Sequence, residues 1–155
     1  MASENDTKRH PVLTIWIPNE PVPKARARHR NVRTRAGQEF VTSYTPKKSV
    51  MFENWVRHCA LDEIEKLGDG FLGMQGALGL RLRFYLQRPK SVSIKKRKYP
   101  EVKPDLDNLE KSVMDGLKLA GAYKNDSQVC DLSSKKRYHN EFYPPGVGVS
   151  LWTIA

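Results

Sequence analysis

The spacing of apolar residues predicts a chain that alternates strands and helices. Residues 12–17 form a short apolar run with Ile, Val and Trp, which is typical of a buried strand. Residues 79–87 place Leu and Phe at every second position, with Arg, Tyr and Gln between them, so we expect a half-buried strand there. Two more strands are expected at 129–138 and 147–154, joined by a Pro-Pro-Gly turn at residues 144–146.

Helical spacing occurs in two segments. We expect the first helix to run from about Pro46 to Leu67, with Thr45 as its N-cap and Gly68 ending it. The residues on or near its apolar face are Phe52, Val56, Cys59, Ala60, Ile64 and Leu67. The second helix is expected to begin around Asp107 and to end at Gly121. Its apolar residues are Leu106, Leu109, Val113, Leu117 and Ala120.

The order strand, helix, strand, helix, strand, strand predicts one small mixed α/β domain over residues 12–155. Residues 1–11 are polar and are expected to form a flexible tail. This tail lacks the apolar stretch of a signal peptide, and no window of 18 apolar residues occurs, so we expect a cytoplasmic protein without a membrane span. Cys59 and Cys130 lie in apolar patterns without a ligand-spaced Cys or His, which favours buried free thiols over a zinc site.

Basic residues exceed acidic ones by 27 to 17, a net charge of +10, which favours nucleic acid as the partner. The stretch 24–35 is expected to be a loop or an irregular hairpin with dense positive charge. For the second basic cluster, residues 95–98, a solvated flexible loop is the alternative to a DNA contact. The candidate DNA-binding residues are Lys24, Arg26, Arg28, Arg33, Arg35, Lys47, Lys95, Lys96, Arg97 and Lys98.

The segment 103–111 carries the candidate chemistry. Pro104 disfavours helical backbone at Lys103, so Asp105 and Asp107 should lie where the second helix starts and its dipole tolerates negative charge. If the following strand returns beside that start, Asp126 could approach the pair. A cluster of carboxylates resists joint ionisation, and Mg²⁺ or Mn²⁺ would remove that conflict. Such an ion could support phosphodiester hydrolysis by activating a bound water.

Structural roles are the alternative for each of these residues. Asp105 and Asp107 could be helix caps, and Asp126 could be a turn residue. Lys111 could stabilise charge at a reacting phosphorus or fix a carboxylate, or it could be the (i, i+4) surface partner of Asp107. Asp115, one turn further along, is expected to be solvated surface.

These residues resemble a known family. The block Lys-Pro-Asp-Leu-Asp-Asn-Leu-Glu-Lys at 103–111, then Asp-Gly-Leu at 115–117, Gly121 and Asn-Asp-Ser-Gln-Val at 125–129, is similar to the RusA-type Holliday-junction resolvases of bacteria and their phages. The Pro-x-Pro-Lys-x-Arg stretch starting at Pro21 agrees with the same family. The resemblance spans about residues 14–138.

The resemblance implies a small α/β homodimer that binds four-way junctions and nicks two symmetric strands with Mg²⁺, in DNA recombination and repair. It implies metal-binding roles for Asp105, Asp107 and Asp126 and a catalytic role for Lys111. The family often has Asp-Asp where this chain has Asn125-Asp126, so the resemblance gives Asn125 no ligand role.

Three other functions remain open from the sequence. The chain could be a less selective nuclease acting on flaps, forks or other branched DNA. It could bind DNA without catalysis, in which case the aspartates are caps and turn residues. The charge alone also permits an RNA-binding accessory protein.

Overall fold

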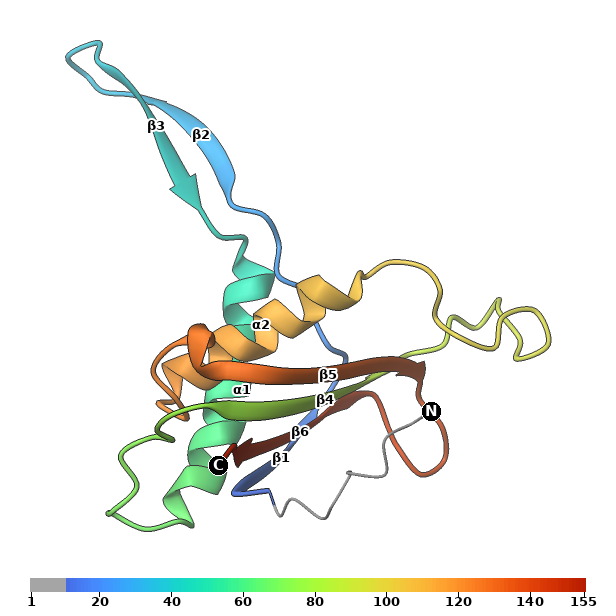
Figure 1. Ribbon diagram of the computed structural model, residues 1–155. Helices are drawn as coiled ribbons and strands as arrows, with labels where there is room; N and C mark the ends of the chain where they lie inside the picture. The colour runs from blue at the N-terminus through green and yellow to red at the C-terminus, as the bar shows by residue number, and fades with distance from the viewer. Residues whose placement is uncertain (1–10) are drawn as a thin grey trace.

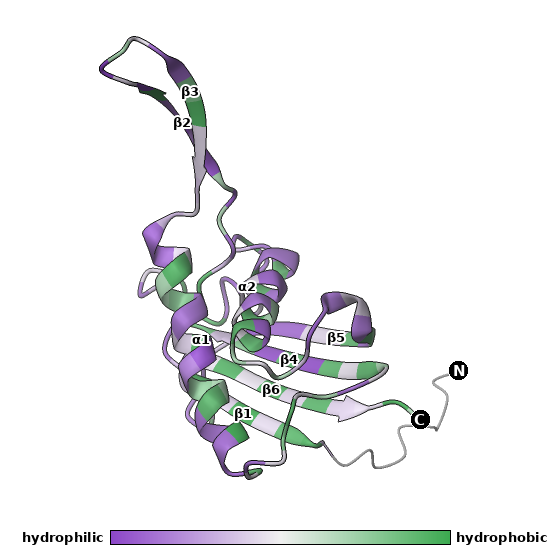
Figure 2. Cartoon of the chain, turned by 90° about the vertical axis from the view of Figure 1, so that its left-hand side faces the viewer, coloured by the Kyte–Doolittle hydropathy of each residue, from purple (hydrophilic) through white to green (hydrophobic). Residues whose placement is uncertain are grey.

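A four-stranded mixed sheet with both helices on one face forms the body of the protein, as the computed structural model of residues 11–155 shows (Figures 1 and 2). The strands are β1 (Leu13–Pro18), β4 (Leu78–Leu86), β5 (Val129–Tyr138) and β6 (Gly146–Thr153), in the order β1-β6-β4-β5. The helices are α1 (Lys47–Glu65) and α2 (Leu106–Leu119). The predicted mixed α/β domain is therefore confirmed. The tail expected at residues 1–11 lies outside the described residues except for Pro11.

The last two strands of the chain are not neighbours in the sheet, because β4 lies between them. Strand β4 pairs with β5 in parallel and with β6 antiparallel, and β6 pairs antiparallel with β1. A parallel pair needs a long crossover connection, and α2 lies within the connection from β4 to β5. The Pro-Pro-Gly turn thus leads the chain from one edge strand past β4 to the inner strand β6.

The core lies between the sheet and the helices. Every second side chain of β4, from Leu78 to Leu86, is buried, which confirms the predicted alternation. The two helices contribute their apolar faces, and they approach closely at Gly116 of α2. A Cβ atom at Gly116 would lie 2.5 Å from the Cβ of Val56 on α1, so only glycine allows this contact. Within residues 11–155, neither helix is long and apolar enough to cross a membrane.

Three local predictions were wrong. Pro46, not Thr45, occupies the N-cap position of α1, because its extended backbone (ψ 139°) lies outside the helix. Leu67 follows the end of α1 and is 43% exposed, so it does not belong to the apolar face. Cys59 is buried as expected, but Cys130 is exposed. It is the extra residue of a bulge, since Leu78 pairs with Val129 and Gly79 with Asp131.

A long hairpin projects away from the sheet and helices (Figure 1). It consists of β2 (Arg28–Arg33) and β3 (Glu39–Tyr44), which form a separate two-stranded sheet, and we call residues 28–44 the arm. Its turn is closed by the N–H of Gly37 donating to the carbonyl of Thr34 at 2.9 Å, with Gly37 at a positive φ of 83°. A hairpin was one of the two forms predicted for the basic stretch, but it was expected to be irregular, whereas β2 and β3 pair without a register shift.

Candidate active site

Two of the predicted acidic residues lie at the start of α2. Asp105 is at the N-cap position with extended backbone, and no side-chain capping hydrogen bond from it is found in the described part of the chain. Asp107 lies in the first turn, where its Oδ1 accepts a hydrogen bond from the N–H of Asn108 at 2.9 Å. Both side chains are exposed. The helix start therefore presents two carboxyl groups to solvent.

Strand β5 holds this end of α2 in place. The ammonium group of Lys136 donates to the carbonyls of Val102 and Pro104, at 2.7 and 2.8 Å, directly before the helix starts. One turn into the helix, Glu110 accepts a hydrogen bond from Ser134 of β5. Strand β5 therefore fixes the backbone that carries Asp105 and Asp107, which we call the acidic pair.

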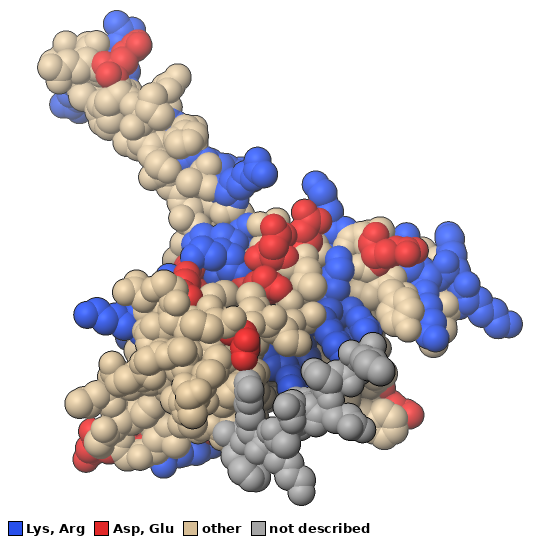
Figure 3. Space-filling view, in the orientation of Figure 1, with Lys and Arg blue, Asp and Glu red and all other residues tan. Residues whose placement is uncertain are grey.

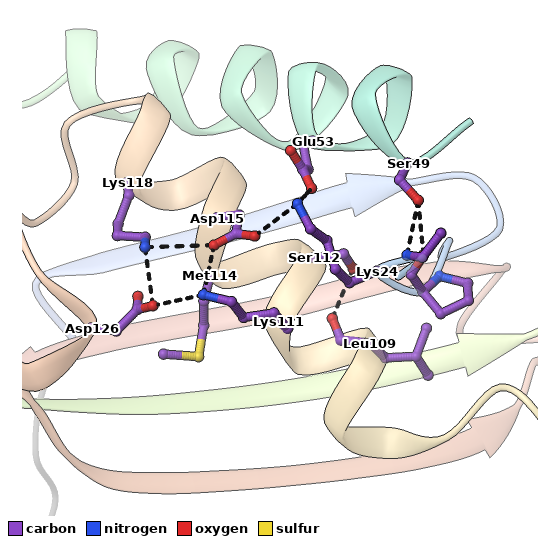
Figure 4. A network of polar contacts seen from close by, with 12 residues as sticks. Lys24, Ser49, Glu53, Leu109, Lys111, Ser112, Met114, Asp115, Lys118 and Asp126 are labelled. Atoms are coloured by element: carbon purple, nitrogen blue, oxygen red, sulfur yellow. Dashed lines mark hydrogen bonds and ion pairs between the residues drawn. The ribbon is translucent and has the colours of Figure 1, made fainter. Parts of the chain in front are cut away.

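A network of alternating charges follows the exposed side of α2 towards its end (Figure 4). Lys111 Nζ lies 2.9 Å from Asp115 and 3.0 Å from Asp126, and Lys118 Nζ lies 3.5 and 3.0 Å from the same two carboxylates. Lys24, from the segment before the arm, lies 3.1 Å from Asp115 and also pairs with Glu53 of α1. Three lysines and three carboxylates thus balance in charge and connect α1, α2 and two loops.

Asp126 is placed by a small capping unit. It begins a short 3₁₀ helix, η1 (Asp126–Gln128), in which the side chain of Asn125 caps the backbone of Gln128. The Gln128 side chain in turn accepts hydrogen bonds from the N–H groups of Lys124 and Asn125, and donates to the carbonyls of Met74 and Gly76. Asn125 and Gln128 therefore build the loop that carries Asp126.

The lysines hold Asp115 and Asp126 in their ionised forms. Partial burial raises the pKa of Asp115, but hydrogen bonds from Lys111 and Lys24 outweigh it and the net pKa lies below the ordinary value. The same balance lowers the pKa of Asp126, with Lys118 and Lys111 as the donors. Hydrogen bonds to Asp115 and Asp126 raise the pKa of Lys111, so it is a cation at neutral pH.

Tyr123 completes the surroundings of Asp126. Its hydroxyl donates to Asp126 Oδ1 at 3.3 Å, while the ring is buried. Burial, followed by the negative charge of Asp126, raises the pKa of Tyr123 well above its ordinary value. Tyr123 is therefore a neutral hydrogen-bond donor and not a general base.

The three predicted metal ligands differ in their placement along α2. Asp105 and Asp107 occupy its first turn, whereas Asp126 lies beside Lys111, Asp115 and Lys118. Eight residues separate Asp107 from Asp115, a rise of about 12 Å along the helix. In the part of the chain that the structure describes, no three His, Cys, Asp or Glu side chains are arranged to hold a metal ion. Carboxylate oxygens suit Mg²⁺, but the arrangement does not gather these three.

Asp115 was predicted to be solvated surface, and this was wrong. Its side chain is only 16% exposed, because Lys24 reaches it from a segment far away in the sequence. Sequence reasoning also missed Lys118, Glu53 and Tyr123. One signal was available: Lys111, Asp115 and Lys118 are spaced (i, i+4, i+7), which places them on one helix face. The (i, i+4) partner of Lys111 is accordingly Asp115 and not Asp107.

The candidate DNA-binding residues lie in four places. Those of the arm and its root are exposed: Arg26, Arg28, Arg33 and Arg35. Lys47 is exposed at the start of α1, and the 95–98 cluster lies in the loop between β4 and α2, where only Arg97 is partly buried. Lys24 is directed at two carboxylates, so a phosphate would compete with them for its charge. Figure 3 shows acidic side chains between the basic arm and the basic loop.

The root of the arm is attached next to the acidic pair. The N–H of Lys24 donates to the carbonyl of Asn108 at 2.8 Å, one residue beyond Asp107. The N–H of Ala25 donates to the buried hydroxyl of Ser49 on α1 at 3.1 Å. The basic arm and the start of α2 are therefore parts of one surface.

Comparison with known proteins agrees with the resemblance found in the sequence. The family model described as endodeoxyribonuclease RusA matches residues 18–151, which include Asp105, Asp107, Lys111 and Asp126. The uncharacterized protein YqaN of Bacillus subtilis (strain 168) is 40% identical over 75 residues, covering 43% of this chain and 52% of YqaN. The match thus spans about half the length of that relative. With nearly the whole chain matched by the family model, this protein belongs to the endodeoxyribonuclease RusA family.

Proposed function

We propose that this protein is a structure-selective endodeoxyribonuclease that resolves Holliday junctions by Mg²⁺-dependent phosphodiester hydrolysis, nicking two symmetric strands as a homodimer in DNA recombination and repair. The observation that carries the proposal is the family match over residues 18–151, which contains the acidic pair and the charge network of α2. Acting on DNA also agrees with the net charge of +10.

The distribution of charge supports DNA as the substrate. The arm and the loop that contains residues 95–98 lie on two sides of the α2 start (Figure 1), so a duplex that contacted both would pass close to Asp105 and Asp107. Binding through several phosphates releases counterions, so affinity should fall steeply as salt rises. In this proposal the two basic segments position the backbone, and the acidic pair faces the phosphate to be cut.

Asp105, Asp107 and Asp126 would supply the oxygen ligands of the metal. The ion, Mg²⁺ or Mn²⁺, would lower the pKa of a bound water and neutralise phosphate charge. Asp105 and Asp107 are exposed at the helix start, where an ion could reach them from solvent. Asp126 would have to exchange its lysine partners for the ion.

Lys111 would act as a fixed positive charge beside the reacting phosphate. Its side chain is 48% exposed, which leaves the ammonium group accessible from the DNA side. Its raised pKa keeps it protonated, so it cannot serve as a base at neutral pH. In the DNA-free protein it fixes the carboxylates of Asp115 and Asp126, and in the complex it would stabilise charge at phosphorus.

A homodimer would match the symmetry of the substrate. A four-way junction has two-fold symmetry, and a two-fold protein presents equivalent sites to opposing strands. Paired nicks at symmetric positions would then follow from the geometry of the complex.

Cleavage of a synthetic four-way junction, with and without Mg²⁺, tests this proposal. We expect Asp107→Asn to abolish cleavage while junction binding in EDTA stays close to wild type. Asp69→Asn is the matched control, since Asp69 is an exposed aspartate in the turn after α1, outside the site. Wild-type cleavage by Asp107→Asn would refute the site assignment.

A less selective branched-DNA nuclease is the alternative within the enzyme class, and a non-catalytic DNA-binding protein the alternative outside it. The second is favoured by one observation: among residues 11–155 the three aspartates are not gathered around one point. Comparing the cleavage rates of four-way, three-way and linear duplex DNA distinguishes the less selective nuclease from a junction resolvase. Absence of any Mg²⁺-dependent cleavage would establish the second.

A further inference from the structure

The two faces of the arm differ in chemistry. In the register of β2 and β3, Arg28 pairs with Tyr44, Arg30 with Thr42 and Val32 with Phe40. Directly paired residues share a face of a sheet, so these six side chains lie together, and we call them the aromatic–basic face. The opposite face carries His29, Asn31, Arg33, Glu39, Val41 and Ser43.

The rings of the aromatic–basic face are accessible. Phe40 is 46% exposed and Tyr44 is 49% exposed. The arm is a two-stranded sheet apart from the core, so none of its strands has a packed layer beneath it. Phe40 and Tyr44 therefore lie on the same face as Arg28 and Arg30 and are not part of the hydrophobic core.

We propose that the aromatic–basic face binds unpaired DNA bases at the branch point, with Phe40 and Tyr44 stacking on bases while Arg28 and Arg30 contact the adjoining phosphates. The proposal rests on the proposed function, because it names the part of a branched substrate that the arm recognises. A base within a duplex has both faces stacked, whereas a base at an open branch offers a face to a ring. An arm that held only phosphates would need the arginines and not the rings.

Charge argues for DNA over a second copy of this chain as the occupant. The arm carries four arginines (Arg28, Arg30, Arg33 and Arg35) and one acidic residue, Glu39. A two-fold contact between two such arms would place like charges against each other. A polyanion with exposed aromatic bases satisfies both the arginines and the rings.

The position of the arm fits this role. Its root is bonded to Asn108 beside Asp107, and each strand of six residues extends about 20 Å. The nine residues that lead from Lys24 to the far end of β2 (33 minus 24) span at most about 33 Å, so bases held on the arm would lie within about that distance of Asn108. The arm would select substrates that have an opening near the bond to be cut.

Binding experiments in EDTA test the proposal without cleavage. The probes are a short oligothymidylate with one central 2-aminopurine, a four-way junction with 2-aminopurine at the branch, and a fully paired duplex. We expect wild-type protein to quench the fluorescence of the first two probes.

The double variant Phe40→Leu/Tyr44→Leu should remove this quenching. It should also weaken binding of the oligothymidylate by about five- to hundredfold for each base that loses its stacking ring, while the salt dependence of binding stays unchanged. Arg28→Gln/Arg30→Gln should reduce the slope of log K against log salt by about 1.4 on the same single strand.

Val41→Ala is the matched control, because Val41 is an exposed apolar residue of β3 on the opposite face. It should bind all three probes like the wild type. The proposal is overturned if Phe40→Leu/Tyr44→Leu behaves like Val41→Ala. It is also overturned if the double variant changes only the protein's sedimentation and not its DNA binding, since the face would then join two copies of the chain. Quenching that persists in a protein unable to cut junctions would refute the proposed function and leave this inference standing.

Discussion

The ammonium group of Lys111 lies 3.0 Å from a carboxylate oxygen of Asp126, and Lys118 lies 3.0 Å from the same oxygen. Two ammonium groups therefore contact one carboxylate oxygen of Asp126. Both lysines also reach Asp115, so releasing Asp126 does not leave them without a counter-charge. If Asp126 binds a metal ion as proposed, it must exchange these two lysines for the ion.

Removing Lys118 should favour the metal-bound state. Lys118→Gln deletes one cation that competes for Asp126, so we expect half-maximal junction cleavage at a lower Mg²⁺ concentration. The ion pair is about one-third exposed, so the change should not exceed about fivefold. A Mg²⁺ titration of the cleavage rate measures it, with the exposed Lys124→Gln as control. If Lys118→Gln needs a higher Mg²⁺ concentration than the wild type, Lys118 does not compete with Mg²⁺ for Asp126.

Lys111→Gln should impair chemistry more than binding. The substitution removes a fixed positive charge from the proposed site, and loss of one such electrostatic contact costs about a hundredfold or more in rate. Single-turnover cleavage at saturating Mg²⁺, beside junction affinity in EDTA, separates the two effects. If the loss of junction affinity accounts for the whole loss of cleavage rate, Lys111 contacts DNA but does not act in the chemical step.

Asp115→Asn should destabilise the fold. The carboxylate accepts contacts from Lys24, Lys111 and Lys118 while 16% exposed, and its removal leaves partly buried ammonium groups without a full counter-charge. Loss of a hydrogen-bonded charge partner at such a site costs about 1–3 kcal/mol. Urea unfolding measures the change, and Asp69→Asn, at an exposed turn, should leave stability near that of the wild type.

The same carboxylate should make stability depend on pH at the acid end. The pKa of Asp115 is lowered in the folded protein, so the unfolded chain takes up a proton first as pH falls. The contribution is complete above the unfolded pKa, about 3.9, and is lost as pH falls through the lower folded value. Wild type should therefore lose more unfolding free energy than Asp115→Asn across this window. Parallel curves for the two proteins would show that the network does not couple to protonation of Asp115.

Gly116→Ala should be costly for packing. The added methyl group would lie 2.5 Å from Val56 and 2.9 Å from the carbonyl oxygen of Glu53, so α1 and α2 must move apart. Overpacking of this kind costs about 1–3 kcal/mol. Gly70→Ala is the control, because its Cβ would meet nothing within 4 Å. Thermal unfolding of both variants compares them directly.

Most of the body of the fold was predictable because its signal is local. The alternation in β4 and the apolar stripe of α2 each follow from burial against one layer, and both were confirmed. The arm gave no such signal, since a hairpin without a core has no buried face to impose a period. Sequence reasoning could therefore recognise its charge but could not choose between a loop and a hairpin.

The acidic residues show where local reasoning ends. Asp105 and Asp107 lie at the helix start as predicted, because Pro104 limits where the helix can begin. The place of Asp126 depends on the parallel pairing of β5 with β4, which makes β5 begin near the end of α2. Asp115 was misjudged because its partner Lys24 is 91 residues earlier in the sequence (115 minus 24). Contacts between segments that are distant in the sequence produce no repeating pattern of residues, so the sequence did not reveal the contact between Lys24 and Asp115.

The peptide hydrogen bond from Lys24 to Asn108 places the root of the arm directly beside the turn that carries Asp107. This connection runs from backbone to backbone and does not pass through the hydrophobic core. DNA held on the arm would therefore be held by a segment that is bonded to the helix start presenting Asp105 and Asp107.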